Sequence, residues 1–169
     1  MGGSGGGGQS LNKDELRALE EAARASLREA AEPKKRNVFI SFVEEDLAEV
    51  NLLRGQAKNE NTNLEFNDWS LKEPFDSENA EYVRRGIRER IRQSSVTVCY
   101  ITENTTRSKW VDWEIRESIR LGKGVIAMYK GDKPPLSLPP AIVELDIKVI
   151  PWNHMEITRA IDNAVSDKN

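Results

Sequence analysis

The chain has 169 residues, a formal net charge of −3, 38% hydrophobic residues and 31% charged residues, so it is long enough to bury one core. No apolar run approaches about 18 residues, which excludes a membrane-spanning helix. The mildly acidic balance argues against a nucleic-acid-binding protein. Cys99 and His154 are the only cysteine and histidine, which excludes an internal disulfide and disfavours a Ser-His-Asp triad. No secretion signal is evident, and we expect a cytoplasmic protein.

Residues 1–10 are rich in glycine and predict a flexible leader that takes no part in the fold. Residues 11–33 predict an amphipathic helix, with Asn12 as N-cap, Glu15 three residues later, and Pro33 at its end. Its apolar side chains recur at three- and four-residue spacing, at Leu16, Leu19, Ala23, Leu27 and Ala30. We expect this helix to pack on the rest of the chain or on a partner subunit.

From residue 37 to 169, predicted strands and helices alternate. Almost continuous apolar runs at 38–43, 96–101 and 125–129 predict strands covered on both faces. The runs 64–66 and 147–150 alternate between apolar and polar residues, as edge strands do. Helical spacing is found over 47–57, 82–91, 108–122 and 155–165, and Gly122 suits the position after a helix end.

Strands that alternate with helices predict an α/β fold with a parallel sheet. Placing the alternating strands at the edges gives the order 2-1-3-4-5, a flavodoxin-like three-layer sandwich with five strands and an extra N-terminal helix. Such sheets bind ligands beyond the carboxyl ends of their strands, near the switch between strands one and three. The functional residues are therefore expected after Phe42, Phe66 and Ile101.

The residues after the first predicted strand disfavour some of the ligands that flavodoxin-like sheets bind. Phe42-Val43-Glu44-Glu45-Asp46 contains three carboxylates and no glycine, which disfavours a flavin or nucleotide phosphate site. A response-regulator receiver needs an aspartate phosphoacceptor after the third strand, where Glu103 stands instead. An unrelated flavodoxin-like binding protein stays open as an alternative.

The segment from Ser108 to Ile115 holds the most informative carboxylate. On a helix, Val111 and Ile115 face the sheet, while Trp110 and Glu114 form the adjacent row. No lysine or arginine stands three or four residues from Glu114. A carboxylate beside aromatic surface without a local counter-ion is a candidate catalytic or ligand group, and an ordinary half-exposed helix glutamate fits the same spacing.

From residue 37 to 152 the chain resembles a Toll/interleukin receptor (TIR) domain of the bacterial group found in Thoeris antiphage defence. Val38-Phe39-Ile40-Ser41-Phe42 resembles the first-strand motif of the family, and Ser108-x-Trp110-Val111-x-x-Glu114-Ile115 resembles its Ser-x-Trp-x-x-x-Glu helix motif. Gly122-Lys123 also fits, and Asp68 falls where the second strand of the family runs into its BB loop.

The resemblance implies an enzyme that cleaves the nicotinamide–ribose bond of NAD, by hydrolysis or by cyclisation to a cyclic ADP-ribose signal. The catalytic role then falls on Glu114, whose carboxylate would stabilise an oxocarbenium-like transition state. Trp110 would stack on nicotinamide or support the pocket, and Ser41 and Phe42 would line its floor.

The resemblance also implies a loop over residues 68–79 that closes over the substrate, with Asp68, Trp69 and Glu73 as binding residues. Val43-Glu44 departs from the family, several of whose enzymes carry basic residues there. NAD would be a substrate, and neither a separate cofactor nor a metal is expected.

The expected partners are NAD, other copies of the chain through TIR surfaces, and a downstream effector that reads the nucleotide signal, but neither nucleic acid nor membrane. One predicted helix is rich in arginine and predicts a solvated or self-associating face, formed by Arg84, Arg85, Arg88, Arg90 and Arg92. The alternative function is a non-catalytic TIR interaction module.

Overall fold

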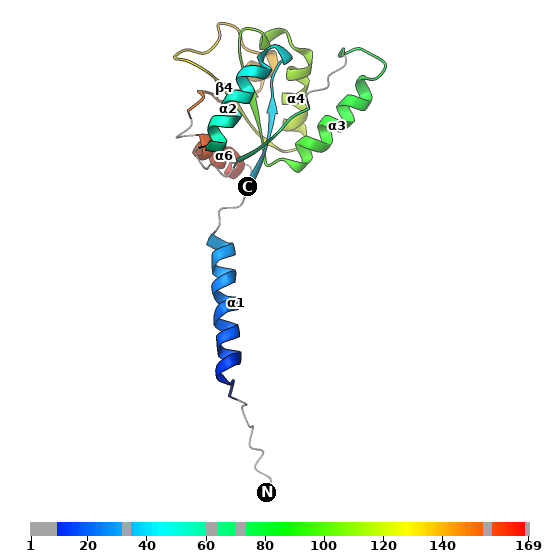
Figure 1. The fold of residues 1–169 in the computed structure, drawn as a ribbon. Coiled ribbons are helices and arrows are strands. Elements are labelled where there is room, and N and C mark those ends of the chain that lie inside the picture. The colour runs from blue at the N-terminus through cyan, green and yellow to red at the C-terminus, as the bar shows by residue number, and fades with distance from the viewer. Residues whose placement is uncertain (1–9, 32–34, 60–63, 70–73, 154–156, 168–169) are drawn as a thin grey trace. The chain divides into compact units, whose positions relative to one another are not determined.

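The structure is a computed structural model that describes residues 10–31, 35–59, 64–69, 74–153 and 157–167. The chain divides into two compact units, Met1–Lys34 and Lys35–Asn169. The labelled elements are shown in Figure 1. Almost all of the predicted glycine-rich leader lies outside the described residues.

The first unit contains helix α1 (Lys13–Ala31). Its N-terminus is closed by a reciprocal pair of hydrogen bonds, in which the amide of Glu15 donates to Asn12 Oδ1 at 2.8 Å and the amide of Asn12 donates to Glu15 Oε2 at 2.9 Å. The predicted cap at Asn12 is thereby confirmed. None of the described helices combines the length and apolar character needed to cross a membrane.

The second unit alternates strands and helices. The strands are β1 (Arg36–Ser41), β2 (Leu64–Asn67), β3 (Val96–Tyr100), β4 (Gly124–Tyr129) and β5 (Val149–Pro151). The α-helices are α2 (Leu47–Asn59), α3 (Ala80–Gln93), α4 (Lys109–Arg120), α5 (Pro140–Glu144) and α6 (Ile157–Ser166), and two short 3-10 helices are η1 (Glu44–Asp46) and η2 (Thr105–Arg107).

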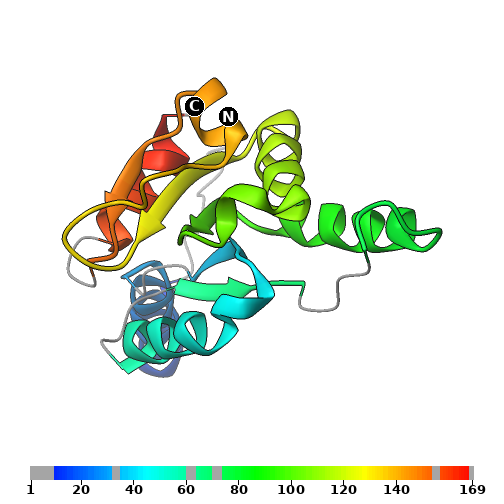
Figure 2. The ribbon, with the colours of Figure 1, turned by 90° about the horizontal axis from the view of Figure 1, so that it is seen from above.

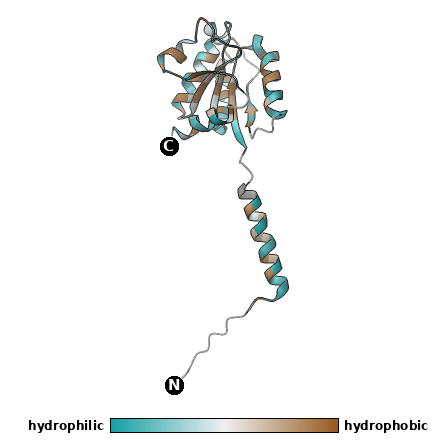
Figure 3. Cartoon of the chain, turned by 90° about the vertical axis from the view of Figure 1, so that its left-hand side faces the viewer, coloured by the Kyte–Doolittle hydropathy of each residue, from teal (hydrophilic) through white to brown (hydrophobic). Residues whose placement is uncertain are grey.

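All the strand pairs are parallel, and the sheet order is β2-β1-β3-β4-β5, which confirms the predicted order. Every residue of the central strand β3 is buried, whereas β2 and β5 at the edges are only half-buried or exposed. The strands are accordingly coloured as mainly hydrophobic in Figure 3. The apolar runs therefore distinguished central strands from edge strands because both faces of the central strands are covered.

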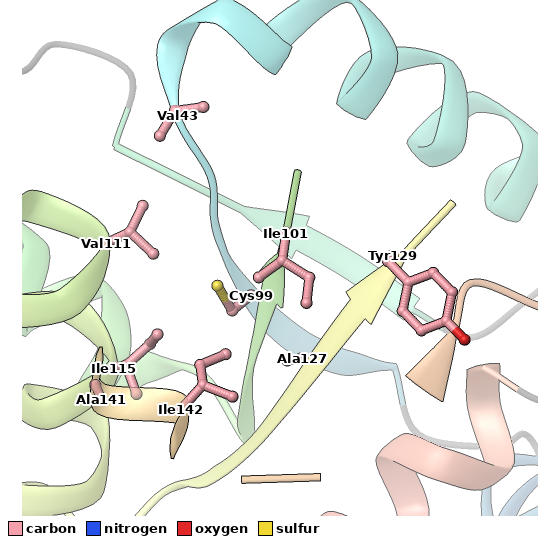
Figure 4. Close-up of a cluster of buried hydrophobic side chains, with 9 residues drawn as sticks. All are labelled: Val43, Cys99, Ile101, Val111, Ile115, Ala127, Tyr129, Ala141 and Ile142. Atoms are coloured by element: carbon pink, nitrogen blue, oxygen red, sulfur yellow. The ribbon is translucent and has the colours of Figure 1, made fainter. Parts of the chain in front are cut away.

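Helices cover both faces of the sheet (Figure 2). The first face packs against α3, α4 and α5, and the second face packs against α2 and α6. On the first face, Cys99 and Ile101 contact Val111 and Ile115 of α4 and Ile142 of α5, in the cluster shown in Figure 4. The chain thus forms the predicted three-layer sandwich.

Side chains alternate between these faces along β1. Val38 and Ile40 belong to the clusters on the second face, while Phe39 packs with α3 and Trp110 on the first face. Ser41 follows two residues after Phe39, so its hydroxyl points toward α4. This alternation is what brings a buried serine to the helix that carries Glu114.

Several predicted boundaries differ from the structure. The first strand ends at Ser41 rather than residue 43, because Val43 accepts the amide of Asp46 and the chain turns into η1. The helix α5 was not predicted, because prolines usually mark loops, yet Pro140 stands at its first turn, where a missing N–H has no cost. Gly122 has φ 75° after α4, which confirms its predicted position.

Candidate active site

A pocket of about 420 Å³ opens at the carboxyl ends of the central strands, beside the switch between β1 and β3. Three segments contribute its walls: the residues after β1, the residues before α3, and the stretch from the loop after β3 into the first turn of α4. The lining residues are Phe42, Val43, Glu44, Glu45, Pro74, Phe75, Asn104, Arg107, Ser108 and Trp110. The pocket therefore lies where sheets of this topology bind ligands.

Glu114 follows the lining residue Trp110 by one turn of α4 and is not itself among the lining residues. Its side chain is fully buried, at 0% exposure, and its carboxylate accepts a hydrogen bond from the hydroxyl of Ser41, which is also fully buried. Ser41 immediately precedes Phe42, a lining residue. The carboxylate is thus fixed between the end of β1 and the first turns of α4.

The same face of α4 continues into a second buried hydroxyl pair. The hydroxyl of Ser118 donates to the backbone carbonyl of Glu114 at 2.7 Å and lies 2.8 Å from Thr97 Oγ1 in β3. Both hydroxyl residues are fully buried. Polar side chains therefore join α4 to β1 and β3, in addition to the apolar row at Val111 and Ile115.

The start of α4 is also fixed. The hydroxyl of Ser108 accepts the amide of Val111 at 3.2 Å, which makes Ser108 the N-cap of the helix. Serine in the predicted helix motif therefore has a local structural reason, because it sets the position from which Trp110 and Glu114 follow.

An aromatic corner forms one side of the pocket. The rings of Phe75 and Trp110 meet edge to face with centroids 5.0 Å apart. The guanidinium of Arg84 lies 4.4 Å from the Phe75 ring centroid and donates to the Phe75 carbonyl at 2.9 Å. Arg84 in α3 therefore holds Phe75 against the pocket.

Asp68 and Phe42 both contact one arginine of α2. The carboxylate of Asp68 forms an ion pair with Arg54, whose guanidinium lies 5.8 Å from the Phe42 ring centroid. Asp68 thereby anchors the residue after β2 to α2, next to a residue that lines the pocket.

Trp69 packs against α3. A side-chain carbon at Gly86 would lie 2.5 Å from the Trp69 ring, so the bare glycine leaves the space that the indole fills. The guanidinium of Arg90 lies 5.5 Å from the same ring. The predicted roles of Trp69 and Asp68 in substrate binding stay predictions.

The carboxylate of Asp46 connects the two loops that border the pocket, the loop after β1 and the loop after β3. The carboxylate of Asp46 in η1 accepts the Thr102 hydroxyl at 2.6 Å and the Asn104 side-chain amide at 3.4 Å. The amide of Thr102 in turn donates to the Thr105 hydroxyl at 2.8 Å. Asp46 therefore connects the residues after β1 to the loop between β3 and α4.

Charged side chains of both signs stand at the rim of the pocket, while the buried phenol of Tyr100 is not among its lining residues. At the rim, Glu44 and Glu45 are exposed carboxylates and Arg107 is an exposed guanidinium. At the end of β3, burial raises the pKa of the Tyr100 phenol, and nearby Glu49 raises it further. Tyr100 therefore stays protonated and uncharged at neutral pH.

The structure brings together four of the predicted site residues: Ser41, Phe42, Trp110 and Glu114. Glu73 lies outside the described residues. Sequence reasoning missed Phe75 and Arg107, which line the pocket from loops without periodicity. The adjacent Pro74 was the one available signal for a structured turn before α3. Among the described residues, no cluster of histidine, cysteine and acidic side chains is arranged to hold a metal ion.

Comparison with known proteins identifies the family. Residues 39–134 match the family described as "Thoeris protein ThsB, TIR-like domain", and the chain belongs to this family. No match was found among curated proteins.

Two solved structures are similar at low identity. The Clostridium botulinum CMP N-glycosidase BcmB is 13% identical over 75% of this chain and 99% of its own, with a TM-score of 0.46. The TIR domains of the activated Roq1 resistosome, which recognises the pathogen effector XopQ, are 16% identical over 79% of this chain and 82% of their own, with a TM-score of 0.41.

Proposed function

We propose that this protein cleaves the nicotinamide–ribose bond of NAD and that Glu114 is its catalytic carboxylate. The observation that carries the proposal is the buried Ser41–Glu114 hydrogen bond directly beside an aromatic-lined pocket at the carboxyl edge of the sheet. Membership of the ThsB TIR-like family supports the same assignment. NAD enters as the substrate, and the proposal needs no separate cofactor or metal.

The chemistry suits one fixed carboxylate. When the bond between C1′ of the ribose and the pyridinium nitrogen breaks, its electron pair stays with nicotinamide, which leaves as a neutral molecule. Positive charge then develops on the ribose, and the Glu114 carboxylate stabilises it. Water adds to C1′ and loses one proton, giving ADP-ribose, whereas attack by a nitrogen of the adenine gives a cyclic product.

The pocket walls have complementary roles in this proposal. Trp110, Phe42 and Phe75 provide flat apolar surface for the nicotinamide ring. Ser41 acts through Glu114 as a positioning residue. Because the Glu114 side chain is fully buried, the ribose reaches it when a ligand displaces the wall formed by Phe42 and Trp110.

The test follows nicotinamide release from NAD by the full-length protein, at concentrations where light scattering demonstrates self-association. We expect release of nicotinamide together with ADP-ribose or its cyclic form, and one proton for each hydrolytic turnover. Absence of nicotinamide from the assembled protein would contradict the proposal.

We further propose that the product is a signal in bacterial antiphage defence, made in the cytoplasm and read by a downstream effector. Family membership is the support for this context. The second candidate function is a non-catalytic TIR interaction module, and the complete burial of Glu114 favours it. Nicotinamide release separates the two functions, because an interaction module leaves NAD intact.

Activity is also proposed to depend on self-association. A copy packed against the segment before α3, or against the arginine-rich helix α3, would favour the conformation in which the pocket admits substrate, and apparent affinity rises with the population of that conformation. Specific activity should therefore increase with protein concentration. The measurement is made on the full chain and on a chain that lacks the residues up to Pro33. Specific activity that does not change with concentration in either protein would contradict this dependence. A concentration dependence seen only in the shortened chain would show that α1 controls the activity.

A further inference from the structure

The rim of the pocket carries charges of both signs on two different loops. Glu44 and Glu45 belong to η1, and Arg107 belongs to η2. All three side chains are exposed to solvent. A ligand in the pocket therefore meets two carboxylates from one segment and a guanidinium from another.

Arg107 differs from the other basic residues around the pocket in having no ion-pair partner among the described residues. Lys109, two residues later, pairs with Asp76 at 3.0 Å. Arg84 is held by the carbonyl and ring of Phe75. Within the described part of the chain, Arg107 is therefore the cation at this pocket that is left to meet a ligand.

We propose that Arg107 binds a phosphate group of the ligand, so that the pocket selects ribonucleotides over nucleosides. This inference rests on the proposed function, because it takes the pocket as the substrate site. A guanidinium presents paired N–H donors that match two phosphate oxygens. The aromatic corner of Phe75 and Trp110 would hold a flat ring at the same time, which separates an apolar portion of the ligand from a charged one.

The neighbouring groups strengthen and limit this selection. Ser108 lines the pocket as the N-cap of α4, and the N-terminal end of that helix favours negative charge. Glu44 and Glu45 repel the same phosphate from the opposite loop. Removing these two carboxylates should therefore strengthen binding of a phosphorylated ligand and leave a neutral ligand unaffected.

The test measures binding of AMP and adenosine to the full chain by calorimetry, since these probes differ by one phosphate. We expect wild type to prefer AMP by about tenfold, as for a charge-assisted hydrogen bond. R107M should abolish the preference. K109M is the matched control, because Lys109 is a nearby cation that does not line the pocket, and it should retain the preference.

The double variant E44Q/E45Q should raise AMP affinity about threefold without changing adenosine affinity, the size expected for exposed charges. Equal binding of the two probes by wild type, or an AMP preference that survives R107M, would overturn the assignment. The readout is independent of catalysis. If the protein cleaves NAD but does not prefer AMP, this inference alone is wrong. If the protein prefers AMP through Arg107 but does not cleave NAD, only the proposed function is wrong.

Discussion

Two glutamates on α4, three residues apart, are both buried but have different surroundings. Glu114 faces β1 and accepts the Ser41 hydroxyl, whereas Glu117 faces α3 and forms ion pairs with Arg88 at 2.9 Å and with Arg120. Two guanidiniums both orient and neutralise the Glu117 carboxylate, whereas the Ser41 hydroxyl orients the Glu114 carboxylate. The contrast separates the face of α4 that joins helices from the face that borders the pocket.

The largest expected effect, on the rate of nicotinamide release, comes from removing the charge of Glu114. Glu114→Gln keeps the shape and removes the charge, so the rate of nicotinamide release should fall by about a thousandfold while the protein stays folded. Glu117→Gln, the same change on the same helix, should leave the rate unaltered. Steady-state kinetics on both variants measures this, and a Glu114→Gln protein with wild-type turnover would remove Glu114 from the reaction.

Ser41 should show an intermediate effect. Ser41→Ala removes the hydroxyl that holds the carboxylate, and we expect kcat to fall about tenfold with KM almost unchanged. Ser118→Ala is the matched control, because among the described residues its buried hydroxyl is bonded to the Glu114 backbone and Thr97 and not to the Glu114 carboxylate. It should lower the free energy of unfolding by about 1 kcal/mol and spare kcat. Equal kcat losses in the two variants would indicate a general structural effect.

On the face of α4 that carries Glu117, the expected effect of a substitution is on the free energy of unfolding. Glu117→Gln leaves Arg88 with fewer partners, and the free energy of unfolding at neutral pH should fall by about 2 kcal/mol. Urea denaturation measures the change. The exposed Glu89, which lies 3.7 Å from Arg92, supplies the control, since Glu89→Gln should have no measurable effect on stability.

The smallest expected effect is the pH dependence of the stability difference between wild type and Glu117→Gln. The hydrogen bond from Arg120, assisted by Arg88, lowers the pKa of the Glu117 carboxyl below its ordinary value of 4.5, although burial opposes the shift. A lowered folded-state pKa means that the stabilisation is complete above that ordinary value and is lost as the pH falls through the folded-state value. The gap between wild type and Glu117→Gln should therefore narrow in acid. A gap that stays constant down to about pH 2 would contradict the ion-pair explanation.

Sequence patterns were sufficient for the sheet and for part of the site. Continuous apolar runs predicted the central strands because both faces are covered, and helical spacing placed Trp110 and Glu114 on one row. The contact between Ser41 and Glu114 joins residues 73 positions apart and depends on strand alternation together with helix packing. Phe75 and Arg107 lie in segments without periodicity, so their placement at the pocket required the tertiary structure.

Asp46 has a consequence for how the pocket borders can evolve. Its carboxylate is shared by Thr102 and Asn104, so the loop after β1 and the loop after β3 depend on one short side chain for their separation. An insertion in either loop would pull one partner away and leave the buried carboxylate without it. We therefore expect a change of length in one loop to require a matching change in the other, whereas the exposed Glu44 and Glu45 beside Asp46 can change in charge and so alter which ligand the pocket prefers.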